Sequence, residues 1–229
     1  MELAARLERI RERIRDAALA CGRDPAAVRL VAVAKTFPPD DIRRAAAAGA
    51  TDIGENYIQE ARAKFEELSG LGVHWHFIGR LQTNKARQAV RMFDLIHTVD
   101  SAHLAAEIDR AAEKLGKVQP VLVQVNVAGE ATKSGVAPAD TAALVSEISR
   151  MQAVRVQGLM TLPPYFDQPE RVRPFFAELR RLAGRIRELA LPNVCMDSLS
   201  MGMTGDFEAA IAEGATLVRV GTAIFGGRG

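Results

Sequence analysis

The sequence is poor in the features that mark secreted, membrane-spanning or nucleic-acid-binding proteins. Its two cysteines, Cys21 and Cys195, fit neither a metal site nor a disulfide framework. No apolar run approaches the roughly 18 residues of a membrane span, and charged residues occupy the N-terminus where a signal peptide needs an apolar core. A net charge of +2 gives no field that attracts nucleic acid or an anionic membrane. We therefore expect a cytoplasmic protein with no nucleic-acid or membrane partner.

The chain also lacks any stretch that would separate two domains. No linker rich in proline, glycine and serine divides its 229 residues, and no low-complexity segment occurs. With 48% hydrophobic and 25% charged residues, the composition is typical of a globular protein with a substantial core. We expect one domain over residues 1–229, with an amphipathic N-terminal helix over residues 1–20 packed on the rest.

After this helix, strand-like and helix-like segments alternate to the end of the chain. The expected strands are Arg29–Ala34, Thr51–Gly54, His74–Ile78, Leu95–Val99, Pro120–Val127, Arg155–Thr161, Val194–Ser198 and Thr216–Val220. Alternation with short connections indicates a parallel sheet. Eight strands favour a closed (β/α)8 barrel of the TIM type with an extra N-terminal helix. An open, doubly wound sheet is the alternative.

Lys35 follows the first expected strand and precedes Thr36, Phe37 and two prolines. In a (β/α)8 barrel, functional side chains gather where the strands end. Poor solvation at such a place disfavours the charged ammonium, and the neutral amine is the form that reacts with an aldehyde. The alternative is a lysine whose head group simply reaches solvent at the rim.

The segments after the last two expected strands are typical of a phosphate site. Ser200 and Thr222 supply hydroxyl groups, while Gly202 and Gly221 allow a ligand to approach backbone N–H groups. Both segments stand where this fold usually binds phosphate. The alternative is that the glycines serve turns and the hydroxyl groups cap helices.

Arg219 lies within an apolar segment, so its guanidinium needs a partner in the protein interior. One interpretation is a buried ion pair with a neighbouring acid. The other is a hydrogen bond to an acceptor on a ligand, such as a pyridine nitrogen. An aldehyde-reactive lysine, a phosphate cup and such an arginine together describe a site for pyridoxal 5'-phosphate (PLP).

Six short segments resemble the pyridoxal phosphate homeostasis protein family, in order and over nearly the whole chain. They are AVAKT at 32–36, GENY at 54–57, HFIG at 76–79, LQTNK at 81–85, SMGM at 200–203 and RVGT at 219–222. The resemblance implies a fold similar to the barrel domain of alanine racemase. It also implies a PLP-binding protein without catalytic turnover that buffers or delivers the cofactor.

The same resemblance implies roles for individual residues. Lys35 would carry the cofactor as an internal aldimine, and Arg219 would face the pyridine nitrogen. Ser200, Gly221 and Thr222 would hold the phosphate. The other cofactor contacts expected from the matching segments are Asn56, His76, Met201 and Gly202. Ala34 and Thr204 stand where the family often has serine, and neither change puts cofactor binding in doubt.

Other polar residues are explained without a ligand. His74 and His76 share one face of a strand but lack a third ligand, so no metal site is expected. Glu55 is either an acid–base group or, in the interpretation we favour, the cap of the following helix. A further group of basic residues is typical of a solvated helix face rather than an RNA site: Arg80, Lys85, Arg87 and Arg91.

Three other functions are compatible with parts of the sequence: an amino-acid racemase, an aldolase that uses a Lys35 Schiff base without PLP, and a structural scaffold. Racemisation needs acid–base groups on both faces of the substrate. In racemases of this fold a tyrosine from a second domain serves one face, by resemblance. Here the only tyrosines are Tyr57 and Tyr165, and the sequence stops soon after the last strand. We therefore expect a non-catalytic monomer or weak dimer, with PLP and PLP-dependent apo-enzymes as partners.

Overall fold

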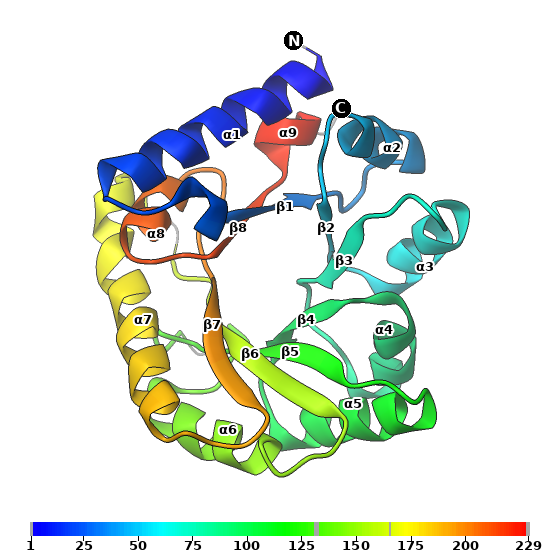
Figure 1. The fold of residues 1–229 in the computed structure, drawn as a ribbon, viewed down its shortest axis with the longest axis vertical. Helices are drawn as coiled ribbons and strands as arrows, with labels where there is room; N and C mark the ends of the chain where they lie inside the picture. The colour runs from blue at the N-terminus through cyan, green and yellow to red at the C-terminus, as the bar shows by residue number, and fades with distance from the viewer. Residues whose placement is uncertain (1, 131–132, 165, 228–229) are drawn as a thin grey trace.

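Eight parallel strands close into a barrel in a computed structural model that describes residues 2–130, 133–164 and 166–227. The strands follow one another around the barrel in chain order, and β1 pairs with β8 to close it (Figure 1). They are β1 (Arg29–Val33), β2 (Asp52–Glu55), β3 (His74–Phe77), β4 (Leu95–Val99), β5 (Gln119–Gln124), β6 (Val154–Met160), β7 (Val194–Ser200) and β8 (Leu217–Val220). The predicted (β/α)8 barrel is confirmed, and the open doubly wound sheet is wrong.

Helices surround the barrel and bury the outer faces of its strands (Figure 1). Those after the strands are α2 (Pro39–Ala47), α3 (Ile58–Glu67), α4 (Ala86–Met92), α5 (Ala102–Lys114), α6 (Thr141–Ile148), α7 (Arg173–Glu188), α8 (Phe207–Ala212) and α9 (Thr222–Phe225). Short 3-10 turns are η1 (Pro25–Ala27), η2 (Thr83–Lys85), η3 (Pro138–Asp140) and η4 (Pro169–Val172).

The N-terminal helix α1 (Leu3–Ala20) covers the part of the ring where α8 and α9 are short. Figure 1 shows it lying across both. Its buried face consists of Leu3, Leu7, Ile10, Ile14 and Ala18, at the spacing of one helix side. Arg6 Nε donates to Ile224 O at 2.6 Å and so joins α1 to α9 directly after the last strand. The chain thus uses its first helix to support the loop that ends its last strand.

Four strands, β1, β3, β5 and β8, are shorter than predicted, and beyond β1 and β5 the backbone finds another partner. The segment predicted as Arg29–Ala34 ends at Val33, because the Ala34 carbonyl accepts from Phe37 N–H and closes a turn. The segment predicted as Pro120–Val127 ends at Gln124. Beyond it, Asn126 N–H donates to Val136 O in the following loop instead of to a barrel strand.

Side chains alternate between the barrel interior and the outer core, as a closed sheet requires. Apolar residues fill part of the interior: Val31, Leu95, Leu122, Met160 and Leu217. Val31 is in register with Asp52 of β2 and with Arg219 of β8. These two polar residues therefore lie at one level of the barrel, on either side of β1.

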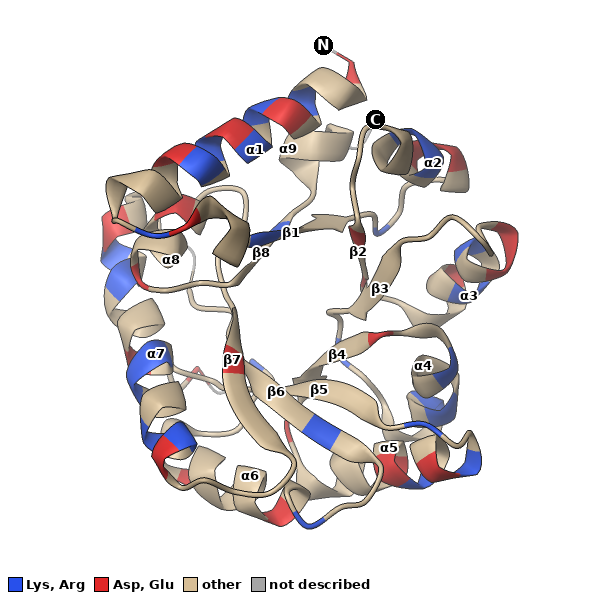
Figure 2. Ribbon diagram, viewed as in Figure 1, with Lys and Arg blue, Asp and Glu red and all other residues tan. Residues whose placement is uncertain are grey.

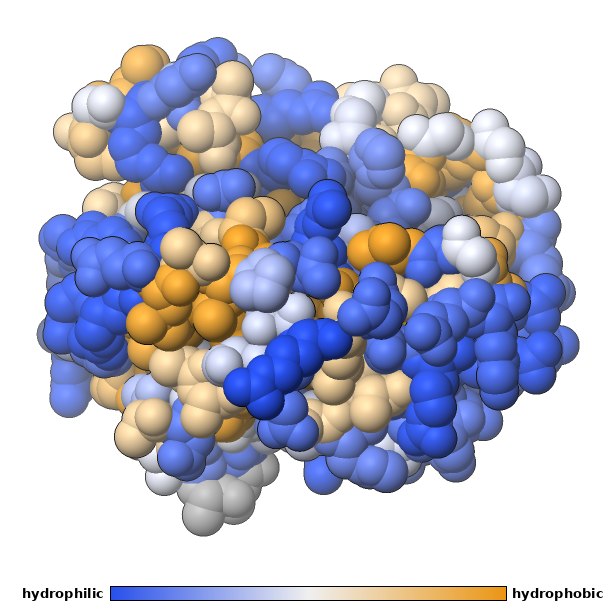
Figure 3. All heavy atoms as spheres, turned by 60° about the horizontal axis from the view of Figure 1, so that its bottom comes forward, coloured by the Kyte–Doolittle hydropathy of each residue, from blue (hydrophilic) through white to orange (hydrophobic). Residues whose placement is uncertain are grey.

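Charged side chains lie mainly on the outer helices, where both signs are mixed, and the strands carry isolated charges (Figure 2). Figure 3 shows one face of the molecule, on which hydrophilic residues surround smaller hydrophobic areas. Among the helices of the described residues, none is long and apolar enough to cross a membrane.

Candidate functional site

Lys35 lies in the turn after β1, at the carboxyl end of the barrel. Val31 and Val33 precede it at intervals of two residues, so it continues the inward-facing series of the strand. Its side chain is half-buried rather than fully buried. It makes no hydrogen bond or ion pair with any residue that the structure describes. The amine is therefore free to react with a ligand at the barrel mouth.

Side chains of α3 hold the turn that carries Lys35. Lys64 Nζ donates to Ala34 O at 2.8 Å, and Thr36 N–H donates to Glu60 Oε1. The peptide groups on both sides of Lys35 are thus fixed by two residues one helical turn apart. Thr36 has a φ of 67°, a left-handed conformation that is costly for a β-branched residue. The α3 contacts stabilise this conformation and so set the position of Lys35.

Glu55 takes part in the same cluster, and its predicted role as a helix cap is wrong. Its Oε1 lies 2.7 Å from Lys64 Nζ, whereas α3 begins only at Ile58, after Tyr57. Lys64 also pairs with Glu60, so one cation serves two carboxylates. Desolvation outweighs the attraction of Lys64 and raises the pKa of Glu55 to about 7, and Glu60 adds to this rise.

The raised pKa of Glu55 predicts a specific loss of stability with rising pH. Because the carboxyl ionises near 4.5 when unfolded and near 7 when folded, its contribution is complete below pH 4.5 and lost as the pH rises through 7. Glu55→Gln should flatten this part of the curve of unfolding free energy against pH. Urea unfolding at a series of pH values measures the unfolding free energy as a function of pH. Glu66→Gln, on the exposed side of α3, is the control. Equal slopes in wild type and Glu55→Gln would contradict the assignment.

Arg219 is buried in β8, and its side chain bonds to Ser200 at the end of β7 and to Thr161 directly after β6. Its Nη1 donates to Ser200 Oγ at 2.5 Å and its Nη2 to Thr161 O at 2.9 Å. No carboxylate of the described residues forms an ion pair with it, so the ion-pair interpretation is not supported. Desolvation lowers the pKa of Arg219 to about 10, against the more distant pull of Asp206. The N–H groups of Arg219 that do not bond to Ser200 or Thr161 can donate to an acceptor on a ligand.

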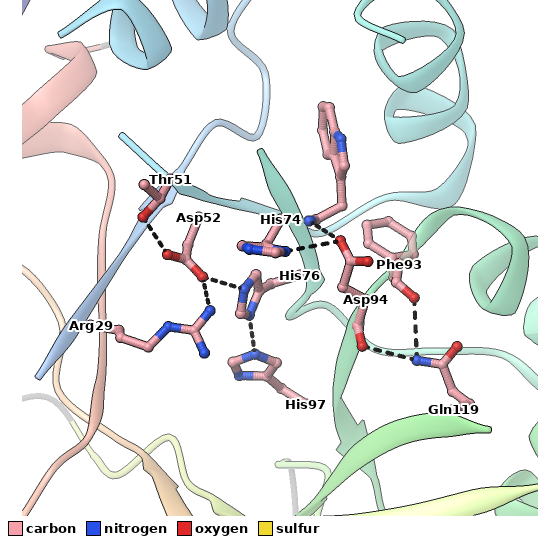
Figure 4. A network of polar contacts seen from close by, with 10 residues as sticks. Arg29, Thr51, Asp52, His74, His76, Phe93, Asp94, His97 and Gln119 are labelled. Atoms are coloured by element: carbon pink, nitrogen blue, oxygen red, sulfur yellow. Dashed lines mark hydrogen bonds and ion pairs between the residues drawn. The ribbon is translucent and has the colours of Figure 1, made fainter. Parts of the chain in front are cut away.

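Hydrogen bonds continue from Ser200 across the barrel interior to Asp52. Ser200 Oγ lies 2.9 Å from His97 Nδ1, His97 Nε2 lies 2.9 Å from His76 Nδ1, and His76 Nε2 lies 2.9 Å from Asp52 Oδ1. Figure 4 shows Asp52, His76 and His97 in this order, with Arg29 beside Asp52. Both ring nitrogens of His76 are therefore occupied by protein groups. His76 thus has no ring nitrogen free to contact a ligand.

The loops after β7 and β8 meet at the mouth, at the place where the sequence predicts a phosphate site. Gly202 O accepts from Arg219 N–H at 3.0 Å and joins the loop after β7 to strand β8. Gly202 has a φ of 91°, and a Cβ there would lie 2.6 Å from Ala210 Cβ, so the position requires glycine. Thr222 is exposed at the start of α9, directly after Gly221. Its hydroxyl group and the first N–H groups of this short helix are the donors available there.

Met201 differs from the other predicted contacts in this loop. Its side chain is buried in the outer core, away from the interior, and its N–H donates to Leu217 O at 3.1 Å. Met201 therefore offers no free donor to a ligand. It anchors the loop that carries Gly202.

Asn56 lies on the opposite side of the mouth, where the structure leaves a polar atom without a partner. Its Oδ1 is buried and has no hydrogen-bond partner among the described residues. Together with Gly79, Thr98 and Lys133 it lines a cavity of about 230 Å³. A Cβ at Gly79 would lie 2.0 Å from Asn56 O, so glycine is required for these loops to pass. A buried, unpartnered amide is a suitable group for contact with a polar ligand.

The basic residues after β3 divide into two groups. Arg87 and Arg91 are exposed on α4, as expected for a solvated helix face. Arg80 and Lys85 instead line a larger cavity of about 860 Å³ beside Asn56. Elsewhere in the described chain, no group of three or more side chains is arranged to hold a metal ion.

The sequence analysis missed Asp52, Lys64 and His97 as parts of the site. His97 interrupts the apolar strand Leu95–Val99 just as Arg219 interrupts β8, and this was the available signal. Lys64 stands four residues after Glu60, which is also the spacing of an ordinary surface pair. Its burial depends on the packing of α3 against β2 and is not visible in the sequence.

Comparisons with known proteins find similar proteins over nearly the full length of the chain. Residues 5–229 match the family described as alanine racemase, N-terminal domain. A relative from Aquifex aeolicus, named pyridoxal phosphate homeostasis protein, is 46% identical over 228 residues and is matched over 99% of its length, with 100% of this chain covered. A protein of the same name from Pseudomonas aeruginosa is 45% identical, with 99% of this chain and 96% of that protein covered. PipY from Synechococcus elongatus, solved with PLP bound, is 40% identical with a TM-score of 0.84, over 98% of this chain and 100% of that chain.

Proposed function

This chain belongs to the pyridoxal phosphate homeostasis proteins, within the alanine racemase N-terminal domain family, and we propose that it binds PLP at the barrel mouth and serves PLP homeostasis. The full-length match to proteins of that name supports the role. The PLP-bound structure of PipY supports the cofactor. One observation in this chain carries the proposal. The amine of Lys35 has no partner among the described residues, and the guanidinium of Arg219 is buried without an ion pair to any of them.

The donors at the mouth match the chemical groups of PLP. When bound, PLP supplies an aldehyde that reacts reversibly with amines, on a pyridine ring that carries a phosphate. Lys35 provides the amine, and the free N–H groups of Arg219 suit an unprotonated pyridine nitrogen. Thr222 and the backbone at Gly221 and Gly202 are the donors we assign to the phosphate.

The remaining predicted contacts divide by position. Asn56 is assigned a polar contact at the mouth, because its buried amide oxygen has no protein partner. His76 and Ser200 lie in the hydrogen-bonded chain below the mouth, and Met201 lies in the outer core. We assign these three to positioning the groups that touch the cofactor.

We further propose that the chain does not turn over amino acids. Racemisation requires one group to remove the α-proton and a second to return it on the opposite face. Lys35 is suited to one face. Across the mouth, Lys133 Nζ is held by Glu130 at 2.7 Å, and Tyr57 is 56% exposed at the start of α3. Tyr165 lies outside the described residues.

The partners proposed for this function are PLP-dependent apo-enzymes that receive the cofactor. The proposed setting is the cytoplasm, where a monomer or weak dimer would exchange PLP with them. Cys21 and Cys195 are both unpaired, which fits a reducing compartment.

Two assays on the PLP-loaded protein test this proposal. We expect an apo-aminotransferase to regain activity when mixed with the loaded protein, and we expect no exchange of the α-proton for deuterium in a panel of amino acids beyond that with free PLP. Exchange that disappears in Lys35→Ala would show a racemase-type enzyme instead. Failure to retain PLP on gel filtration would reject the binding site itself.

A further inference from the structure

A layer of buried polar side chains crosses the interior of the barrel beneath the mouth. Its members come from β2, β3, β4, β7 and β8: Asp52, His76, His97, Ser200 and Arg219. The most exposed of them shows 4% of its surface to solvent. Barrel interiors are usually filled by branched apolar residues. Because its members are buried, such a polar layer is stable only if each group is hydrogen-bonded.

At one end of the layer, Asp52 is an ionised acceptor. Desolvation raises the pKa of Asp52, but hydrogen bonds from His76 and Thr51, together with nearby positive charge, outweigh it and hold this pKa below its usual range. A carboxylate only accepts, so His76 Nε2 must carry a proton and donate it to Asp52. At the other end Arg219 only donates, so Ser200 Oγ must accept from its Nη1.

These two ends determine the direction of every bond between them when both imidazole rings are neutral. A neutral His76 that is protonated at Nε2 accepts at Nδ1, so His97 Nε2 must be its donor. Burial lowers the pKa of His97 well below its usual value, so this ring is neutral and accepts at Nδ1. The Ser200 hydroxyl proton must then point to His97. Each hydrogen bond then has one donor and one acceptor, and no donor faces another donor.

We propose that Asp52, His76, His97 and Ser200 form a one-way hydrogen-bond relay that positions Arg219 for the ligand, with every donor directed from Arg219 toward Asp52. This inference deepens the proposed function, because the ligand that Arg219 faces is taken to be PLP. Asp52, His76 and His97 are positioning residues that act through Ser200.

The relay changes the role expected of Ser200. Its only proton is committed to His97, so Ser200 cannot donate that proton to a phosphate. Instead its oxygen orients the Arg219 guanidinium. Arg219 has no ion pair among the described residues, and the charge of Asp206 acts on it only from a distance. In this proposal, polarisation along the relay adds the effect of the Asp52 charge.

The opposite direction defines the competing arrangement. If His76 carried a second proton, His76 Nδ1 would donate to His97 Nε2, and His97 Nδ1 would donate to Ser200 Oγ. The Ser200 proton would then be free to point into the mouth. If these contacts only stabilised the fold, the direction of their hydrogen bonds would not affect the binding of the ligand.

The direction can be measured on the wild-type protein without PLP, by long-range ¹H–¹⁵N NMR of the four histidines. We expect His76 and His97 both to be neutral and protonated at Nε2. Protonation of either ring at Nδ1 would overturn the proposal. Because no cofactor is needed, this result is independent of whether the proposed function holds.

A double-mutant cycle tests whether the relay reaches the ligand. Asp52→Asn keeps the shape and an acceptor but removes the charge, and Ser200→Ala breaks the relay beside Arg219. We expect each to weaken PLP retention by about tenfold and to shift the absorption band of the bound cofactor, with the double variant no weaker than Ser200→Ala alone. His74→Gln, exposed on the same strand as His76, is the control.

Additive effects of the two substitutions would overturn the relay, since residues that act independently add. Unchanged PLP affinity and spectrum in Asp52→Asn, with lower thermal stability alone, would also overturn it. If Asp52→Asn does not fold, the NMR measurement on the wild-type protein still decides the direction.

Discussion

Lys35→Ala will fold normally and will form no covalent adduct with PLP. The substituted side chain is half-buried and makes no contact by hydrogen bond or ion pair with the described residues, so its loss costs little stability. It is, however, the amine that the structure holds at the mouth through the contacts of Ala34 and Thr36 with α3. Mass measurement after incubation with PLP and reduction with borohydride detects the adduct. Retained PLP, measured by gel filtration, should fall by about tenfold or more.

Lys85→Ala is the matched control for this variant. Lys85 also has no partner among the described residues, and it lines the neighbouring cavity rather than the turn after β1. We expect the same adduct mass as for wild type. A full adduct in Lys35→Ala, or its loss in Lys85→Ala, would show that another amine carries the cofactor.

Arg219→Gln will lower PLP affinity by roughly 10- to 100-fold while the barrel stays folded. Glutamine retains a donor for Ser200 Oγ and Thr161 O but removes the charge that we propose faces the ligand. A hydrogen bond to a charged group contributes about 1.5–3 kcal/mol, which corresponds to roughly this range of affinity. The absorption band of bound PLP should also shift, because an always-charged guanidinium beside the pyridine nitrogen discourages protonation of the ring.

Equilibrium dialysis with a spectrum of the bound form measures both effects. Arg80→Gln is the control, since Arg80 is exposed and acts on the described residues only through its charge, on Asp100. Equal affinity and an unchanged spectrum in Arg219→Gln would mean that the guanidinium only completes the core.

Much of the architecture could be predicted because the strands have strong local signals. Lys35 and Arg219 stood out because each adds a charge to an apolar segment that a parallel sheet must bury. His97 interrupts the apolar strand β4 in the same way, but the sequence analysis assigned it no role. His97 contacts Ser200, which lies 103 positions away in the sequence, and no local sequence pattern contains that contact.

The environment of Lys35 could not be predicted for a related physical reason. The turn at Thr36 is set by Lys64 and Glu60 on the next helix, and the burial of Glu55 depends on how closely that helix packs. Local sequence predicts that a strand ends near Lys35. It does not show that two side chains from α3 hold the peptide groups on either side of it.

Peptide mapping of the wild-type protein after PLP loading and borohydride reduction tests the central claim most directly. Trypsin does not cleave after a modified lysine, so an adduct on Lys35 should appear on a single peptide spanning residues 30–43. We predict one PLP per chain, all of it on that peptide. An adduct on peptides that contain Lys64, Lys85 or Lys133, or no adduct at all, would contradict the account.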